Sequence, residues 1–138
     1  MKTLIKICVV FLFHSCLSTQ NTINSNTGLY KIKKIQTKND WYIIYAEKQD
    51  STFKIVSGSE IGLNSECEKI RVGKSYAFEL KSRRNNVPEI NGVKLSPVNY
   101  LDIECYSFDK DTEICIEPKK GIYDLYHANN LKGLCFFQ

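Results

Sequence analysis

The segment from Leu29 to Ser57 constrains the fold most, because its apolar residues recur with the two-residue period of β-strands. The run "WYIIYAEK", residues 41–48, is apolar on both faces, with Trp41, Ile43 and Tyr45 on one and Tyr42, Ile44 and Ala46 on the other. A strand that is apolar on both faces is typical of the middle of a sheet. Turn residues separate this run from apolar stretches on either side. The sequence therefore predicts a three-stranded meander over residues 29–57.

The meander contains one irregularity. The phase of alternation slips near Lys33-Lys34, which predicts a β-bulge there.

Further strands are predicted downstream of the meander. We expect residues 58–69 to form a loop rich in Gly, Ser, Asn and Glu, and the alternation over residues 76–80 predicts a half-buried strand. Pro and Asn-Gly punctuate a long loop over residues 83–97, and two more strands are expected within residues 100–108 and 112–118. The tail predicts a helical turn, with Ile122, Leu125 and Tyr126 on one face, and then a closing strand that ends at Cys135-Phe136.

The order of these elements resembles an oligonucleotide/oligosaccharide-binding (OB) fold, over about residues 29–82. A meander, a connecting loop and a strand introduced by "VGKSYAFEL" carry the resemblance. It implies a mainly β protein with a small OB-fold-like antiparallel barrel of five to seven strands, here with disulfides. The alternative architecture is a small β-sandwich. With 138 residues, the chain is long enough for one domain.

The chain contains six cysteines, of which four lie in the expected domain: Cys67, Cys105, Cys115 and Cys135. An even number in a small exported chain predicts two disulfides. A hairpin centred on Lys110 would pair Cys105 with Cys115. The alternative pairs Cys115 with Cys135 and Cys67 with Cys105, and we favour it because closing long loops stabilises a chain more. Zinc sites use closely spaced cysteine pairs, and the sequence contains none, so no metal or other cofactor is expected.

The N-terminus reads as an export signal over residues 1–16. Lys2 and Lys6 precede the apolar run "ICVVFLF", which is too short to span a bilayer as a helix. Ser15-Cys16 then resembles the lipobox of bacterial lipoproteins, with Phe13 and His14 in place of the usual Leu and small residue. This predicts lipid attachment at Cys16, a flexible tether over residues 17–28 and one β-rich domain over 29–138. The alternative is cleavage after Ser18, which would release a secreted or periplasmic protein. The whole chain resembles small exported bacterial proteins and lipoproteins.

The charge pattern does not indicate a nucleic-acid partner. The 19 Lys and Arg residues exceed the 15 Asp and Glu residues by four, but two of the lysines belong to the expected signal. Charges of both signs alternate along the remaining chain, without a long basic block. Three basic doublets stand out: Lys33-Lys34, Arg83-Arg84 and Lys119-Lys120. Tyr42 and Tyr76 could form a stacking platform on an OB barrel, although alternating tyrosines usually pack in the core.

No catalytic set is visible in the sequence. His127 is the one histidine of the expected mature chain, and Asp124 would face it only in a helix. The carboxylate pairs have the i,i+2 spacing of a solvated strand face: Glu66/Glu68, Asp102/Glu104 and Asp109/Asp111. Residues 109–113 lack the spacing and the glycine of an EF-hand calcium loop. We therefore expect a protein without enzymatic activity.

These observations predict an exported binding module, tethered to the membrane at Cys16, in the cell envelope. Its partner would be a protein or an envelope component, and not a nucleic acid. The alternative is a small secreted inhibitor or effector that engages an enzyme or receptor through a disulfide-held loop such as Arg83–Pro97. Lipidation discriminates between the two, because a tethered protein does not act as a diffusible effector.

Overall fold

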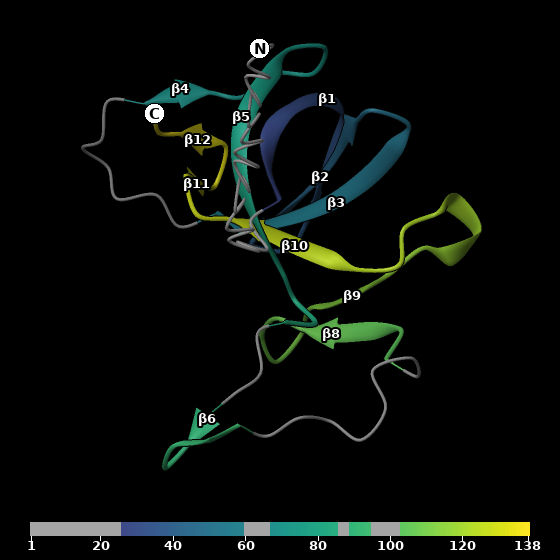
Figure 1. Cartoon of the computed structure of the whole chain (residues 1–138), viewed down its shortest axis with the longest axis vertical. Coiled ribbons are helices and arrows are strands. Elements are labelled where there is room, and N and C mark those ends of the chain that lie inside the picture. The colour runs from purple at the N-terminus through teal and green to yellow at the C-terminus, as the bar shows by residue number, and fades with distance from the viewer. Residues whose placement is uncertain (1–25, 60–66, 86–88, 95–102) are drawn as a thin grey trace, which may run out of the picture.

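Five strands close into a barrel, which confirms the predicted mainly β, OB-fold-like architecture (Figure 1). The structure is a computed structural model and describes residues 26–59, 67–85, 89–94 and 103–138. The barrel strands are β1 (Asn26–Lys38), β2 (Trp41–Lys48), β3 (Ser51–Gly58), β5 (Ser75–Ser82) and β10 (Leu125–Ala128). They follow the order β1-β2-β3-β10-β5, and β5 pairs again with β1. All neighbouring strands are antiparallel except β10 and β3, which run parallel. The sequence predicted a wholly antiparallel barrel, and the structure differs from that prediction at this one pair.

The predicted bulge in β1 is confirmed, and it lets one strand serve two neighbours. The register with β2 shifts between Ile32 and Lys34. Residues Asn26 to Lys31 pair with β5, and residues Lys31 to Lys38 pair with β2. Because a bulge increases local twist and bend, it allows β1 to curve around the barrel.

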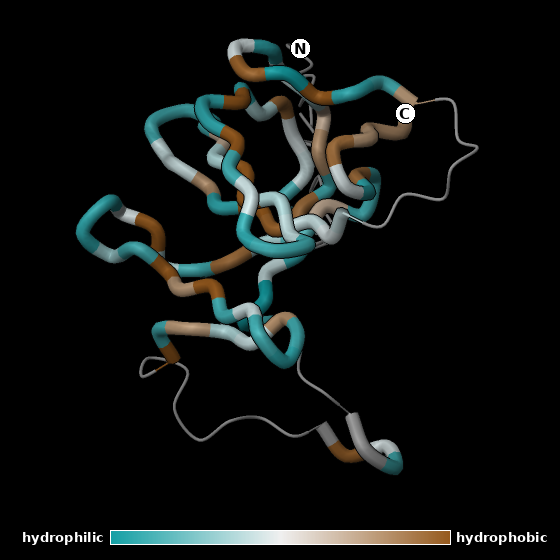
Figure 2. Tube along the Cα trace, turned by 180° about the vertical axis from the view of Figure 1, so that it is seen from behind, coloured by the Kyte–Doolittle hydropathy of each residue, from teal (hydrophilic) through white to brown (hydrophobic). Residues whose placement is uncertain are grey.

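Hydrophobic and hydrophilic residues succeed one another along the barrel strands (Figure 2), and the buried hydrophobic side chains form the barrel core. The interior is lined by a cluster that includes Tyr30, Ile32, Ile44, Ile55, Phe78 and Leu80. Tyr76 is only 3% exposed and belongs to this cluster, and Tyr42 packs against it. Both tyrosines therefore contribute to the core and not to an external stacking platform.

A satellite sheet covers one side of the barrel. It comprises β11 (Leu131–Lys132), β12 (Cys135–Phe136) and β4 (Glu68–Lys69), in that order. The Cys67–Cys135 disulfide joins the central strand β12 to the residue that precedes the edge strand β4, and Phe136 packs into the barrel core. The closing strand predicted at Cys135-Phe136 is thus confirmed, although it lies outside the barrel.

The connection between β5 and β10 folds back over the barrel as a disulfide hairpin. Its strands are β8 (Cys105–Ser107) and β9 (Glu113–Cys115), shorter than predicted, and a small hairpin of β6 (Glu89–Ile90) and β7 (Val93–Lys94) precedes them. Cys105 lies opposite Cys115 in the register, and the two form a disulfide. The hairpin centred on Lys110 is confirmed, and the pairing we favoured from loop lengths is wrong. Cross-strand register decided the partner, because it places these two side chains together regardless of loop entropy.

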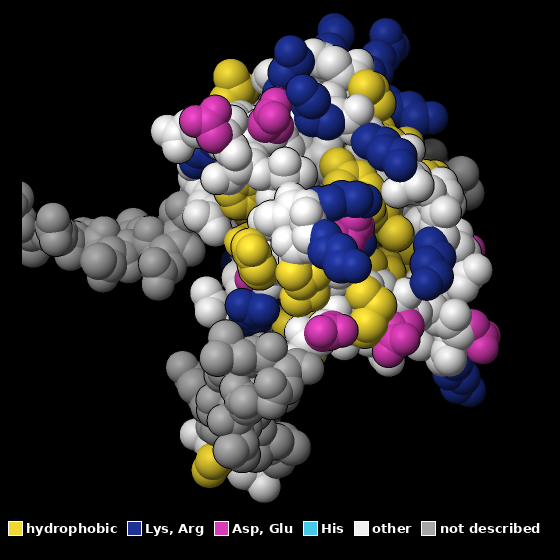
Figure 3. All heavy atoms as spheres, turned by 90° about the vertical axis from the view of Figure 1, so that its right-hand side faces the viewer, with side chains coloured by type: hydrophobic (Ala, Val, Ile, Leu, Met, Phe, Trp, Pro, Cys, Tyr) yellow, Lys and Arg dark blue, Asp and Glu magenta, His cyan; other side chains and the backbone are white. Residues whose placement is uncertain are grey.

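The remainder of the connection leads into β10 through a tight turn. A 3₁₀ helix spans Pro118–Lys120 and ends at Gly121, whose φ of 73° is in the left-handed region. Lys and Arg side chains gather on the face that carries this turn (Figure 3). The predicted helical turn at residues 122–126 is wrong, because Leu125 and Tyr126 belong to barrel strand β10.

No helix among the described residues is long and apolar enough to cross a membrane. The expected signal and Cys16, residues 60–66, and part of the Arg83–Pro97 loop lie outside the described residues, as do Glu66 and Asp102.

Candidate functional site

A second apolar cluster forms where the disulfide hairpin packs on the outer face of β2, β3 and β10. Its buried members are Ile43, Val56, Ile114, Ile116 and Leu125. Trp41, Tyr45, Tyr106 and Phe108 pack around them. The hairpin therefore explains why β2 is apolar on both faces: one face lines the barrel and the other lies under the hairpin.

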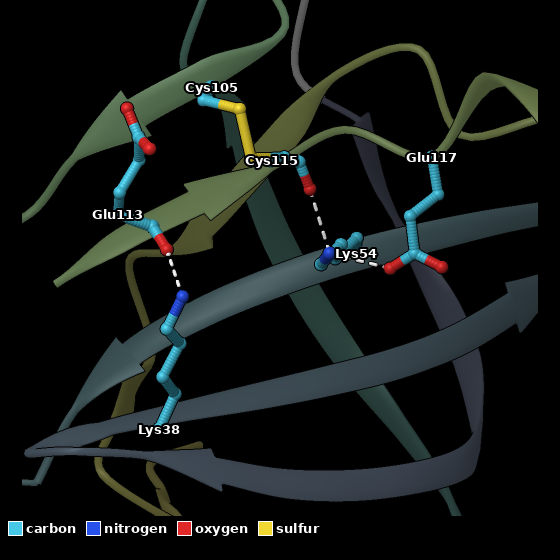
Figure 4. Close-up of a disulfide and its surroundings, with 6 residues drawn as sticks. All are labelled: Lys38, Lys54, Cys105, Glu113, Cys115 and Glu117. Atoms are coloured by element: carbon cyan, nitrogen blue, oxygen red, sulfur yellow. Dashed lines mark hydrogen bonds and ion pairs between the residues drawn. A yellow bond between two sulfur atoms is a disulfide. The ribbon is translucent and has the colours of Figure 1, made fainter.

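Polar contacts fix the hairpin on the barrel (Figure 4). Lys54 of β3 is 5% exposed, and its Nζ donates to the Cys115 carbonyl at 2.7 Å and to Glu117 Oε1 at 2.6 Å. The Nζ of Lys38 donates to the carbonyl of Glu113 at 2.6 Å. At the far end of the hairpin, Trp41 Nε1 donates to Asp109 Oδ2 at 2.5 Å. These contacts join both ends of the hairpin to the barrel and position it rigidly.

A groove remains beside the hairpin, and we call it the Trp41 groove. Its inner part has a volume of about 290 Å³ and is lined by Trp41, Val56, Arg83, Phe108, Leu125, Tyr126 and His127. Its outer part, of about 550 Å³, shares Trp41, Val56 and His127 and adds residues of the turns and the satellite sheet, among them Asp40, Ser57, Ser59, Asp109 and Lys132. Cavities of this size with apolar walls and a few polar groups are typical of ligand sites.

Aromatic rings and a guanidinium group form the wall on the hairpin side of the inner part. The ring centroids of Trp41 and Phe108 are 4.9 Å apart, with the planes tilted by 60°. The Arg83 guanidinium lies 5.1 Å from the Phe108 centroid and 5.9 Å from that of Tyr106. Stacking on aromatic rings holds a guanidinium in place while leaving its hydrogen-bond donors available.

His127, in β10, also lines the inner part of the groove. His127 of β10 lies opposite Lys81 of β5. Burial lowers the pKa of His127 below its usual value, and the charges of Lys81 and Arg83 lower it further. At neutral pH the inner part therefore presents the Arg83 cation and a neutral imidazole, and no carboxylate among the described residues lines it.

The outer part has mixed charge. Its lining includes two carboxylates, Asp40 and Asp109, and the ammonium group of Lys132. The hydrogen bond from Trp41 lowers the pKa of Asp109, with a smaller contribution from the backbone N–H of Asp111. The inner part of the groove is thus basic and aromatic, and the outer part carries charges of both signs.

The residues weighed in the sequence are only partly brought together here. His127 and Asp109 both line the outer part of the groove, whereas Asp124 bonds to Ser82 and to the Leu125 N–H instead of facing His127. Within the described residues, His127 forms no hydrogen bond with a serine or a carboxylate, so no nucleophile–base pair is assembled. Glu113 lies close to the sulfurs of Cys105 and Cys115, but disulfide sulfurs are not thiolate ligands.

Sequence reasoning did not single out Trp41 or Phe108, which are ordinary strand and hairpin residues by pattern. It named Arg83 only in a basic doublet and as the start of the Arg83–Pro97 loop. Only the fold-back of the hairpin brings the three together.

No protein-family model, curated protein or solved structure matches this chain. The two disulfides indicate an oxidising, non-cytoplasmic location.

Proposed function

We propose that this protein is an exported, non-enzymatic binding module, tethered to the membrane at Cys16, that holds a protein or envelope component in the Trp41 groove. The observation that carries the proposal is the groove itself, with aromatic walls and the Arg83 guanidinium stacked beside His127. An acidic group of the ligand would lie against Arg83, because the inner part has a cation and no carboxylate among the described residues.

Preorganisation supports a binding role. The disulfide and the bonds from Lys38, Lys54 and Trp41 hold the hairpin before any ligand arrives. A rigid site loses less conformational entropy on binding than a mobile one. The alternative, a secreted inhibitor acting through the Arg83–Pro97 loop, would use the same hairpin as a support.

The experiment uses Trp41 as a reporter, since it is the only tryptophan in the chain. The full-length tethered protein captures components from solubilised envelopes, and each captured component is titrated into the protein while Trp41 fluorescence is followed. We expect a saturable change that Arg83→Gln/His127→Gln weakens at least tenfold. The matched control is Lys69→Gln/Lys74→Gln, which changes exposed residues away from the groove. Capture that is insensitive to the groove variant, without a Trp41 signal, would refute the proposal.

A further inference from the structure

Two of the basic doublets, distant in the sequence, meet at one tyrosine ring. The Nζ of Lys34, in β1, lies 5.8 Å from the centroid of the Tyr45 ring. The Nζ of Lys120, in the turn before β10, lies 6.0 Å from the same centroid. Lys54 approaches it at 5.6 Å. Ammonium groups at such distances are attracted by the ring's electrons, so Tyr45 helps to hold this cluster of like charges.

The bulge in β1 explains how its doublet faces solvent. In a regular strand, successive side chains point to opposite faces. Here Ile32 is fully buried and Ile35 packs on the same core, while both residues between them are exposed. The shifted register at this point turns Lys33 and Lys34 outward together, with Lys34 opposite Tyr45.

The turn before β10 presents the second doublet. Lys119 and Lys120 form the 3₁₀ turn that Gly121 ends, and both are exposed. Lys120 pairs with Glu117, and its side chain is still 68% exposed. Tyr123 follows in the same connection and is 60% exposed. This segment therefore offers two cations and an aromatic surface to solvent.

The charge balance of this surface is positive. We define the lysine face as the four exposed lysines Lys33, Lys34, Lys119 and Lys120, with Glu47 and Glu117, the carboxylates that pair with Lys33 and Lys120. The face carries four exposed cations against two anions, and Glu117 also compensates the buried Lys54. The entire chain after the expected signal has an excess of only two, because the 19 basic residues less Lys2 and Lys6 stand against 15 acidic residues. The rest of that chain therefore has equal numbers of basic and acidic residues, so its excess of two lies in this set. Figure 3 shows Lys and Arg side chains on the face that carries the turn before β10.

We propose that the lysine face binds an acidic polysaccharide, a chain of sugar units that carry sulfate or carboxylate groups. Two exposed doublets on separate elements fit a ligand with repeated charges better than they fit a single anion. Tyr123 supplies a surface on which a sugar ring can pack. The disulfides indicate a non-cytoplasmic location, which separates this face from the anionic lipids of the cytoplasmic leaflet. None of these lysines lines the Trp41 groove, so the two sites are independent.

The test measures binding of the mature protein to heparin, as a sulfated probe, and to polygalacturonate, as a carboxylated one. Neutral dextran is the blank. The variant is Lys34→Gln/Lys119→Gln, which removes two exposed charges and leaves the Lys54–Glu117 pair intact. The matched control, Lys69→Gln/Lys81→Gln, removes two exposed charges that belong neither to the lysine face nor to the lining of the Trp41 groove. Unfolding midpoints check that all variants are folded.

We expect the wild type and the control variant to bind at least one of the two acidic polysaccharides, with an affinity that falls as the salt concentration rises. In the face variant we expect affinity to fall at least tenfold. The slope of log affinity against log salt should also become shallower by roughly 1 to 2, because a complex with two fewer lysine contacts releases fewer counterions when it forms. No binding by the wild type, or equal loss in variant and control, would overturn the proposal. Phosphatidylserine vesicles and duplex DNA are the competing ligands, and binding to either that is as tight as to the polysaccharides would also overturn it.

Discussion

At the scale of single residues, Glu117 joins the hairpin connection to the barrel. Its carboxylate accepts hydrogen bonds from Tyr45 and Lys54, each at 2.6 Å, and from Lys120. Burial alone would raise the pKa of Glu117, but these three donors outweigh it and lower the pKa to about 2. Burial and the bond to Glu117 also raise the pKa of Tyr45. Glu117 is therefore ionised at all physiological pH values and offsets the buried Lys54 ammonium.

Replacing Glu117 with Gln should strongly destabilise the protein. Lys54 has a side chain that is only 6% exposed, and it would lose its counter-charge. Leaving one member of a buried pair uncompensated costs about 3–5 kcal/mol. Urea unfolding measures this loss in the free energy of unfolding. The control is Glu113→Gln, because Lys38 contacts the Glu113 backbone carbonyl and not its carboxylate. Equal stability of the two variants would contradict the role assigned to Glu117.

The same carboxylate gives a pH dependence with a definite sign. Its pKa is about 2 in the folded protein and close to 4.5 when unfolded. The unfolded state therefore binds more protons between these values, so the stability from Glu117 is complete above pH 4.5 and is lost as the pH falls toward 2. Unfolding free energies measured across this window should fall more steeply for the wild type than for Glu117→Gln.

At the scale of secondary-structure elements, the sequence predicted strands and their irregularities best where only one face of a strand is buried. The bulge at Lys33-Lys34 was visible because Ile32 and Ile35 break the alternation locally. Strand β10 was mistaken for a helical turn because Leu125 packs under the hairpin while Tyr126 packs in the barrel. A strand buried on both faces shows no alternation, and the four residues of β10 are too few to reveal it by length as the eight residues of β2 did.

The disulfides show the limit of arguments from chain entropy. Loop closure favours pairing Cys67 with Cys105 and Cys115 with Cys135. The register of the hairpin instead places Cys105 opposite Cys115, so Cys67 pairs with Cys135. A tryptic digest without reduction should join peptide 55–69 to 133–138, and peptide 95–110 to 111–119. The pairing favoured from sequence would instead join 111–119 to 133–138. Four free thiols would contradict both.

Removing each disulfide should have different consequences. Cys105→Ser/Cys115→Ser loosens the hairpin, and Phe108 and Asp109, which contact Trp41, move with it. We expect Trp41 emission to shift to the red while the barrel remains folded. Cys67→Ser/Cys135→Ser should lower the unfolding midpoint more, because the sequence separation closed is 68 residues and not 10. Chain entropy puts the two losses at about 4 and about 3 kcal/mol.

At the scale of the whole molecule, both proposed sites come from segments that the sequence separates. The groove needs the start of β2, the end of β3, β10, the residue after β5 and the hairpin turn together. The lysine face needs a bulge in β1 and the turn before β10. Sequence patterns record short-range periodicity, so they indicated the barrel and the individual doublets. They could not indicate which distant side chains the long connection would place side by side.

Location decides how these surfaces are used, and the proposed tether at Cys16 would set it. A lipid chain on Cys16 would hold both the groove and the lysine face near the membrane, where envelope components are concentrated. We expect the full-length wild-type protein, produced in a bacterium, to partition into the detergent phase on phase separation. We expect Cys16→Ser to remain in the aqueous phase, since it lacks the acyl chains. Cys67→Ser/Cys135→Ser controls for the loss of a cysteine as such and should still partition into detergent. If wild type and Cys16→Ser both stay in the aqueous phase, the protein is released, and a diffusible inhibitor that acts through the Arg83–Pro97 loop becomes the better description.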